Sequence, residues 1–254
     1  MLELIDITLK QPFVLGPLHE RIEPGQLLGL IGPNGAGKST LLSLISGYLA
    51  PASGEVRLFG QPLGTFTPHQ LAQRRALVTQ HSESAFDWPV REFIRLGQSH
   101  AGEPLAVIVD ALDIRHLLDR GVLSLSGGEM QRVCIARAIN QLAIDPLRAD
   151  DNQQSCLLLL DEPTSALDIG QQQNLMRLLR RLASSPRIAV VCVMHDLNLA
   201  AHYCDKVWLL EQGRLRASGT PIDVLDANCI GEVFGAQVSV VADQVQGVRI
   251  ELAL

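Results

Sequence analysis

The chain has 254 residues, of which 47% are hydrophobic and 19% are charged, and its formal net charge is −6. This composition is typical of a folded globular protein and excludes a disordered chain, while the acidic balance disfavours nucleic acid as a partner. The sequence contains no apolar run near the roughly 20 residues of a membrane-spanning helix, and its N-terminus lacks the apolar core of a signal peptide. We therefore expect a single α/β domain over residues 1–254.

The N-terminal sequence predicts two edge strands, followed by a unit in which a buried strand leads through a loop into a helix. LELIDITL (residues 2–9) and LHERIEPGQ (18–26) have the character of edge strands with a Pro-Gly turn. LLGLIG (27–32) is a short apolar strand that enters a glycine-rich turn, and KSTLLSLISGYLA (38–50) has the apolar spacing of a helix.

The turn between that strand and that helix fits the pattern G-x-x-x-x-G-K-[ST]. Glycines allow backbone N–H groups to surround phosphate oxygens, Lys38 is expected to reach the β- and γ-phosphates, and Ser39 is a candidate Mg²⁺ ligand. A chance glycine-rich turn is disfavoured by the strand before it and the helix after it. The motif predicts a nucleoside triphosphate and by itself leaves kinase, GTPase and ATPase open. The candidate binding residues are Gly32, Pro33, Asn34, Gly35, Ala36, Gly37, Lys38, Ser39 and Thr40.

Two further strands are predicted before the sequence pattern changes from strand to helix. GEVRLFGQPL (54–63) predicts a strand and a turn, and ALVTQ (76–80) a buried strand that ends at Gln80. The Gln80 amide is a candidate contact to the metal or to a catalytic water. From His81 the patterns become helical, so we expect a helical subdomain over residues 81–154, inserted in a nucleotide-binding core formed by 1–80 and 155–254.

LSLSGGEMQRVCIARAIN (123–140) places Ser126, Gly127 and Gly128 just before a helix. The first N–H groups of a helix lack intrahelical partners and the helix dipole is positive there, so this is a second candidate anion site. Because the glycine-rich turn already binds one triphosphate, the simplest interpretation is that this second site serves the nucleotide of another copy of the chain. The alternative is an ordinary helix capped by Ser126, with Glu129 close by.

Later apolar strands end in polar side chains. LLLLDE (157–162) presents Asp161 as a candidate Mg²⁺ ligand and Glu162 as the candidate base that orients water, and IAVVCVMH (188–195) ends at His195, a candidate γ-phosphate contact. Taken separately, these could be an acidic strand end and a structural histidine. Helices are expected from about Gly170 to Ala183 and from Leu197, and two strands within residues 206–219. Apolar strands that alternate with helices predict a mainly parallel sheet covered on both faces.

The motifs GPNGAGKST, LSGGE, LLLLDE and SALD, together with Gln80 and His195, occur in an order that resembles the nucleotide-binding subunit of ABC transporters. The resemblance covers nearly the whole chain. It implies a P-loop NTPase fold of the RecA-like type, with an N-terminal antiparallel β portion and an inserted α-helical subdomain. It also implies ATP and Mg²⁺ as cofactors, and a homodimer in which LSGGE closes over the opposite P-loop and Asp168 lies near the dimer seam.

Within that family, several stretches are similar to importers of metal chelates, which take up haem, ferric siderophores or cobalamin. TQHSESAF and the polar insertion before CLLLLDE resemble the haem importers, while LGPL and the same insertion resemble the cobalamin importers. This implies two membrane permease subunits, one of which inserts a helix into the region after Gln80, and a separate substrate-binding protein. The expected location is peripheral, on the cytoplasmic face of the inner membrane. A soluble ABC ATPase that acts on DNA or ribosomes, and a small-molecule kinase, are the other classes considered.

The sequence departs from the family near its first strands. An aromatic residue usually stacks on adenine there, whereas the segment TLKQPFVLGPL is short and contains only Phe13. Phe13 is therefore the candidate adenine contact, with a packing role at the sheet edge as the alternative. The tail beyond Phe234 has the alternation of strands, and its sequence suggests no function.

Overall fold

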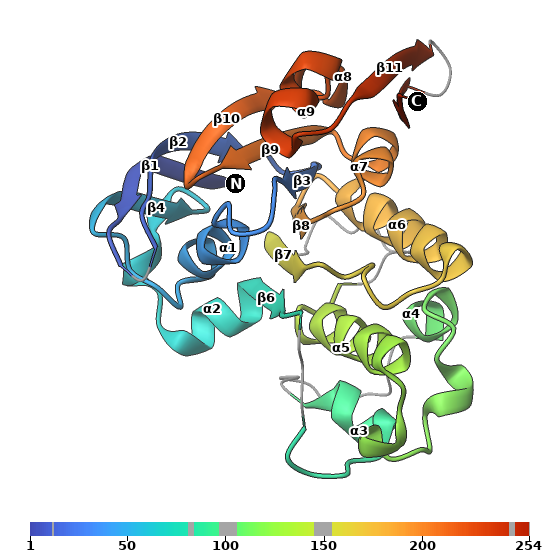
Figure 1. Cartoon of the computed structure of the whole chain (residues 1–254). Helices are drawn as coiled ribbons and strands as arrows, with labels where there is room; N and C mark the ends of the chain where they lie inside the picture. Colours follow the sequence, from blue (N-terminus) through green and yellow to red (C-terminus); the bar gives the residue numbers. More distant parts are fainter. Residues whose placement is uncertain (12, 81–83, 97–105, 145–153, 244–246, 254) are drawn as a thin grey trace.

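The computed structural model describes residues 1–11, 13–80, 84–96, 106–144, 154–243 and 247–253 (Figure 1). Its central feature is a six-stranded sheet in the order β10-β9-β3-β8-β7-β6. All neighbouring pairs are parallel except β9 and β10. This confirms the mainly parallel sheet. The strands are β3 (Leu27–Ile31), β6 (Arg75–Val78), β7 (Cys156–Asp161), β8 (Ile188–Val193), β9 (Lys206–Glu211) and β10 (Arg214–Gly219).

A second, antiparallel sheet is formed by the N-terminal part in the order β2-β1-β4-β5. Its strands are β1 (Leu2–Leu9), β2 (Leu15–Ile22), β4 (Ser53–Leu58) and β5 (Gln61–Pro62). Together the two sheets give the P-loop NTPase fold with an antiparallel N-terminal portion.

The central sheet separates two hydrophobic cores. In β7, Leu158 and Leu160 belong to one core with residues of α5 (Gly127–Gln141) and α6 (Ile169–Ala183), whereas Leu157 and Leu159 belong to the other. That second core contains α1 (Lys38–Ser46) and the antiparallel sheet. Figure 1 shows these two groups on opposite sides of the strands. Burial on both faces explains why β7 reads as a continuous apolar run.

Helix α1 is shorter than the sequence predicted. The expected helix extends to Ala50, but Gly47 has φ 80°, and its N–H bonds back to the preceding turn. A left-handed residue of this kind ends a helix, and glycine adopts the conformation without steric cost.

The regular elements in the described part of residues 84–144 are helices, as predicted: α3 (Val90–Arg95), α4 (Ala106–Ala111), two short 3₁₀ turns (Arg115–Leu117 and Val122–Ser124) and α5. The polar insertion before CLLLLDE, residues 145–155, lies outside the described residues except at its last two positions. No helix in the described ranges is both long enough and apolar enough to cross a bilayer.

Three α-helices of the described residues were not predicted from the sequence: α2 (Pro68–Arg74), α8 (Pro221–Val224) and α9 (Ala227–Phe234). Each follows a Thr or Asp N-cap, and α2 and α8 carry proline in the first turn. Thr67 and Gln70 form a complete capping box at the start of α2. These cap signals were present in the sequence and identify helices too short for apolar periodicity to reveal.

The C-terminal tail forms a hairpin of β11 (Val238–Asp243) and β12 (Gly247–Leu252), as its alternation predicted. The side chain of Asn198, in α7 (Leu197–Tyr203), holds this hairpin to the rest of the fold. Its amide nitrogen donates to the Ile250 carbonyl oxygen at 3.1 Å, and its amide oxygen accepts from the Ile250 N–H at 2.8 Å. One side chain thus pairs with both backbone groups of a strand residue.

The order of the strands brings the predicted site residues to one edge of the sheet. Gly32 follows β3, Gln80 lies two residues after β6, Asp161 ends β7 and His195 lies two residues after β8. All four strands are parallel, so these positions lie at the same carboxyl edge, where α/β sheets place their ligands.

Candidate nucleotide-binding site

The loop between β3 and α1 is a tight turn in which three glycines adopt positive φ. Gly32, Gly35 and Gly37 have φ of 149°, 77° and 99°. A Cβ on Gly32 would lie 2.1 Å from the Leu210 carbonyl oxygen, whereas no atom of the described residues lies within 4 Å of the position of a Cβ on Gly35. Gly37 caps α1 without a side-chain hydrogen bond. The first N–H groups of α1 thus have no capping side chain, which suits an anion.

Lys38 is buried inside this loop. Its ammonium donates to the carbonyl oxygens of Gly32 at 2.8 Å and Pro33 at 3.0 Å, and the residue is only 6% exposed. Burial lowers the pKa of Lys38, against the opposing effect of the Glu162 and Asp161 carboxylates. The loop therefore concentrates a cation and free backbone donors at one point, which is the chemistry that a polyphosphate requires.

Asp161, the last residue of β7, is 8% exposed. Its Oδ1 atom is buried and has no hydrogen-bond partner among the described residues. Burial raises the pKa of Asp161, and a hydrogen bond from the Ser39 side chain partly offsets that rise. An orphaned carboxylate oxygen beside a hydroxyl fits Mg²⁺, which prefers oxygen ligands and takes several of them from phosphate and water. In the described ranges no group of three or more His, Cys, Asp or Glu side chains could bind a metal by itself.

Glu162 is held between the ends of two strands. Gln80 Nε2 donates to Glu162 Oε2 at 2.6 Å, and the His195 Nε2 atom contacts Oε1. The Glu162 backbone has φ 50°, a left-handed conformation that is uncommon for residues other than glycine. Three side chains that the sequence singled out separately are thus in direct contact.

Sequence reasoning missed one residue of this cluster. Gln131, in the second turn of α5, donates from Nε2 to the Glu162 carbonyl oxygen at 2.9 Å. It thereby links the helix that begins at LSGGE to the backbone of Glu162. A glutamine inside a helix carries no signal for such a contact, because the partner lies 31 residues away in the chain.

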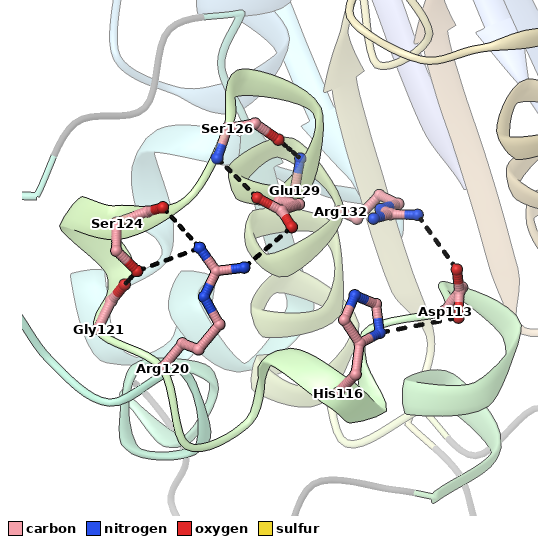
Figure 2. Close-up of polar contacts among 8 residues, drawn as sticks. All are labelled: Asp113, His116, Arg120, Gly121, Ser124, Ser126, Glu129 and Arg132. Carbon is pink, nitrogen blue, oxygen red and sulfur yellow. Dashed lines mark hydrogen bonds and ion pairs between the residues drawn. The ribbon is translucent and has the colours of Figure 1, made fainter.

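Ser126 caps α5, as the alternative interpretation proposed. Its hydroxyl oxygen accepts from the Glu129 N–H at 3.3 Å, and the Glu129 carboxylate accepts from the Ser126 N–H at 2.7 Å (Figure 2). Gly128 also has an explanation within the chain, since a Cβ there would lie 2.6 Å from the Ala166 carbonyl oxygen. The double glycine alone does not therefore require a second nucleotide. Ser126 is nevertheless exposed, although its side chain also hydrogen-bonds the Glu129 carboxylate.

Two other residues are placed by the structure. Asp168 caps α6, with its carboxylate accepting from the Gln171 N–H at 2.9 Å. Phe13 is half-buried against the glycine-rich loop, where its Cε1 would lie 2.7 Å from a Cβ on Gly37 and 3.1 Å from one on Gly213. Phe13 thus packs beside the candidate phosphate site, which agrees with either of its two proposed roles.

Replacing Phe13 with Ala distinguishes those roles. If the ring stacks on adenine, ATP affinity should fall about two- to tenfold, since an aromatic stack contributes roughly 0.5–1.5 kcal/mol. Affinity for inorganic tripolyphosphate, which has no base, should not change. Both dissociation constants can be measured by calorimetry, with Phe13→Tyr as the conservative control. An equal loss for both ligands would assign Phe13 to packing of the loop instead.

The comparisons with known proteins agree with this geometry. The family model described as "ABC transporter" matches residues 15–165. The chain is 43% identical over 224 residues to the hemin import ATP-binding protein HmuV of Escherichia coli O157:H7, covering 86% of this chain and 85% of that protein.

Two solved structures are similar over most of the chain. A protein described as a metal-chelate type ABC transporter, in an inward-facing conformation, matches with a TM-score of 0.75 and 26% identity, covering 99% of this chain and 96% of the other. A bacterial Atm1-family ABC exporter with ATP bound matches with a TM-score of 0.74 and 28% identity, over 88% of this chain and 39% of the other. The chain therefore belongs to the ABC transporter family, as an ATP-binding protein of the kind that hydrolyses ATP to power transport.

Proposed function

We propose that this chain is the ATP-hydrolysing subunit of an importer that takes up haem through separate membrane permease subunits. The observation that supports ATP hydrolysis is the position of Glu162. Gln80 and His195 contact its carboxylate at the same sheet edge that bears Lys38. The haem assignment is supported by the 43% identity to a hemin import protein. Cobalamin or a ferric siderophore is the alternative cargo.

Each residue of the site has a role in phosphoryl transfer to water. The N–H groups of the glycine-rich loop and the Lys38 ammonium bind the β- and γ-phosphates. Ser39, Asp161 and Gln80 would hold Mg²⁺, which when bound neutralises charge on those phosphates. Glu162 orients the attacking water and accepts its proton. His195 fixes the Glu162 carboxylate and contacts the γ-phosphate. Such catalysis depends mainly on positioning and electrostatic stabilisation.

The active form is proposed to be a homodimer in which Ser126 of one copy donates to the γ-phosphate held by the P-loop of the other. The exposed hydroxyl and the open space around Gly127 support this arrangement, since a Gly127 Cβ would meet no described atom within 4 Å apart from its chain neighbours and the backbone of its own helix. Glu162→Gln, in which hydrolysis is slow, is the background in which such a dimer can be measured.

In that background, Ser126→Asp is expected to abolish ATP-dependent dimerisation while the protein keeps its stability. Aspartate caps a helix as well as serine does, but its charge repels phosphate. Sedimentation with and without ATP gives the oligomeric state, and thermal unfolding checks the cap. Ser126→Asn, an equally good cap without the charge, is the matched control. A Ser126→Asp protein that still dimerises with ATP would exclude Ser126 from the partner's nucleotide.

Exposed aromatic side chains mark the surface proposed to receive the permease. Phe86 and Trp88, in the segment that follows Gln80, are 68% and 40% exposed. The Trp88 carbonyl oxygen accepts from the Val122 N–H at 2.9 Å, so this segment lies against the residues that precede LSGGE. Aromatic side chains of this kind are enriched in protein interfaces. In this arrangement the subunit is peripheral, on the cytoplasmic face of the inner membrane.

The experiment that tests the function uses a permease and a substrate-binding protein identified from the open reading frames that neighbour the gene of this chain. The three are co-purified and reconstituted in proteoliposomes, and ATP hydrolysis is measured with the binding protein loaded with haem, cobalamin or a ferric siderophore. Haem is expected to stimulate hydrolysis and to accumulate inside. Stimulation by another chelate alone would reassign the cargo, and co-purification with ribosomes or DNA instead of a membrane complex would contradict the transport role.

A further inference from the structure

The first turn of α5 carries a negative charge at the point where the proposed function requires a phosphate. Glu129 is its third residue, and the Glu129 carboxylate bonds to the N–H of Ser126. This hydrogen bond lowers the pKa of Glu129, so the side chain is ionised at neutral pH. A carboxylate one turn from the proposed γ-phosphate contact competes with that phosphate for the positive helix end and repels it.

One arginine contacts both sides of this turn (Figure 2). Arg120 Nη1 donates to Glu129 Oε1 at 3.2 Å, and Nη2 donates to the Ser124 carbonyl oxygen at 2.7 Å. Ser124 lies two residues before Ser126 and Glu129 lies three residues after it. The two terminal nitrogens of the Arg120 guanidinium therefore bond to residues on either side of Ser126, and the positive charge of this group lies next to the Glu129 carboxylate.

Arg120 is itself fixed in place by the backbone around it. Its carbonyl oxygen accepts from the Val90 N–H at 2.9 Å, within the pairing that also joins Trp88 to Val122. A second arginine, Arg132, is buried and pairs with Asp113 at 3.8 Å; its charge also lowers the pKa of Glu129, but within the described part of the chain it makes no hydrogen bond or ion pair with that carboxylate. Arg120 is thus the arginine in direct contact with Glu129.

We propose that Arg120 is a positioning residue for the nucleotide of a second copy of the chain. It neutralises Glu129 and holds Ser124 and Glu129 together, so the N-terminus of α5 presents Ser126 to a triphosphate without net repulsion. Because the phosphate in question is the one held by the partner's P-loop, this inference rests on the proposed function. It assigns Arg120 no contact with the nucleotide held by its own chain.

The test is a charge-swap series in the slow Glu162→Gln background. Arg120→Gln is expected to weaken ATP-dependent dimerisation about tenfold or more, because Glu129 is left unpaired beside the phosphate. Binding of a fluorescent ATP analogue, measured at concentrations where the protein is monomeric, should not change. Adding Glu129→Gln to Arg120→Gln should restore dimerisation, since glutamine completes the capping box without the charge.

Two further variants separate charge from folding. Arg115→Gln removes an arginine of the same segment that pairs with Asp110 at 2.7 Å, and it should leave dimerisation unchanged. Arg120→Lys keeps the positive charge but replaces the two terminal guanidinium nitrogens with a single ammonium group, and it should retain most of the dimerisation. Thermal unfolding of each variant identifies any loss of fold, and in that case Arg120→Lys and the double variant decide the outcome.

The failures of the two proposals are distinguishable. If the Glu162→Gln parent does not dimerise with ATP, the proposed function is overturned, and this inference with it. If the parent dimerises and Arg120→Gln dimerises equally well, the inference alone is overturned. The same holds if Glu129→Gln gives no rescue, because the effect of Arg120 would then be that of a structural contact.

Discussion

Glu162→Gln is expected to bind ATP and to form a stable dimer, while hydrolysing ATP at least about a hundredfold more slowly than the parent. General-base groups contribute roughly 10²–10⁴ to rate, and the amide lacks the charge and the basicity needed to orient water and accept its proton. Its shape is the same, so the amide oxygen can still accept from Gln80, and the site should otherwise be preserved. Phosphate release measures turnover, and sedimentation with ATP measures the dimer.

A matched control for this variant is Glu232→Gln, which makes the same chemical change at an exposed carboxylate paired with Arg216. It should hydrolyse ATP at the rate of the parent. Normal turnover by Glu162→Gln would remove Glu162 from the proposed mechanism, and His195 would become the first candidate for the base.

Lys38→Ala is expected to lower ATP affinity about thirtyfold or more and to abolish hydrolysis. Truncating one partner of a buried charge pair costs roughly 2–5 kcal/mol, and each 1.4 kcal/mol is tenfold in affinity. The Lys38 ammonium also bonds to the carbonyl oxygens of Gly32 and Pro33, so the variant should unfold at a lower temperature as well. Calorimetric titration with ATP gives the affinity.

The loss of stability has to be separated from the loss of binding. The control is Lys206→Ala, which removes a lysine that pairs with Glu20 at 2.7 Å and has no role in the site. This variant also loses a lysine ion pair, but it should bind ATP with the affinity of the parent. Unchanged affinity and rate in Lys38→Ala would refute the assignment of Lys38 to phosphate.

Much of the candidate site could be placed from the sequence because its residues mark strand ends. Gln80, Asp161 and His195 each come at or just after a short apolar run, and parallel strands carry such positions to one edge. The contacts between these positions could not be predicted from the sequence. That Glu162 is bonded by both Gln80 and His195 depends on side-chain directions and on an unusual backbone conformation, neither of which leaves a periodic pattern.

Contacts across long sequence separations were missed for the same reason. Nothing in the local sequence indicates that Gln131 reaches the backbone of Glu162, or that Gly128 packs against the Ala166 carbonyl oxygen. The latter contact concerns the pair of glycines that the sequence places at a candidate anion site. Close packing within one chain accounts for one of the two glycines.

The contact between Asn198 and Ile250 has a consequence for how the molecule behaves at high concentration. The outer edge of a two-stranded hairpin offers unpaired N–H and C=O groups to any passing chain, and such edges promote intermolecular pairing and aggregation. Here a side-chain amide from α7 occupies one complementary donor and acceptor pair on β12. The amide thus obstructs β12 as a template for a strand of another molecule, next to the charged side chains of Arg249 and Glu251 that flank Ile250 on the same strand.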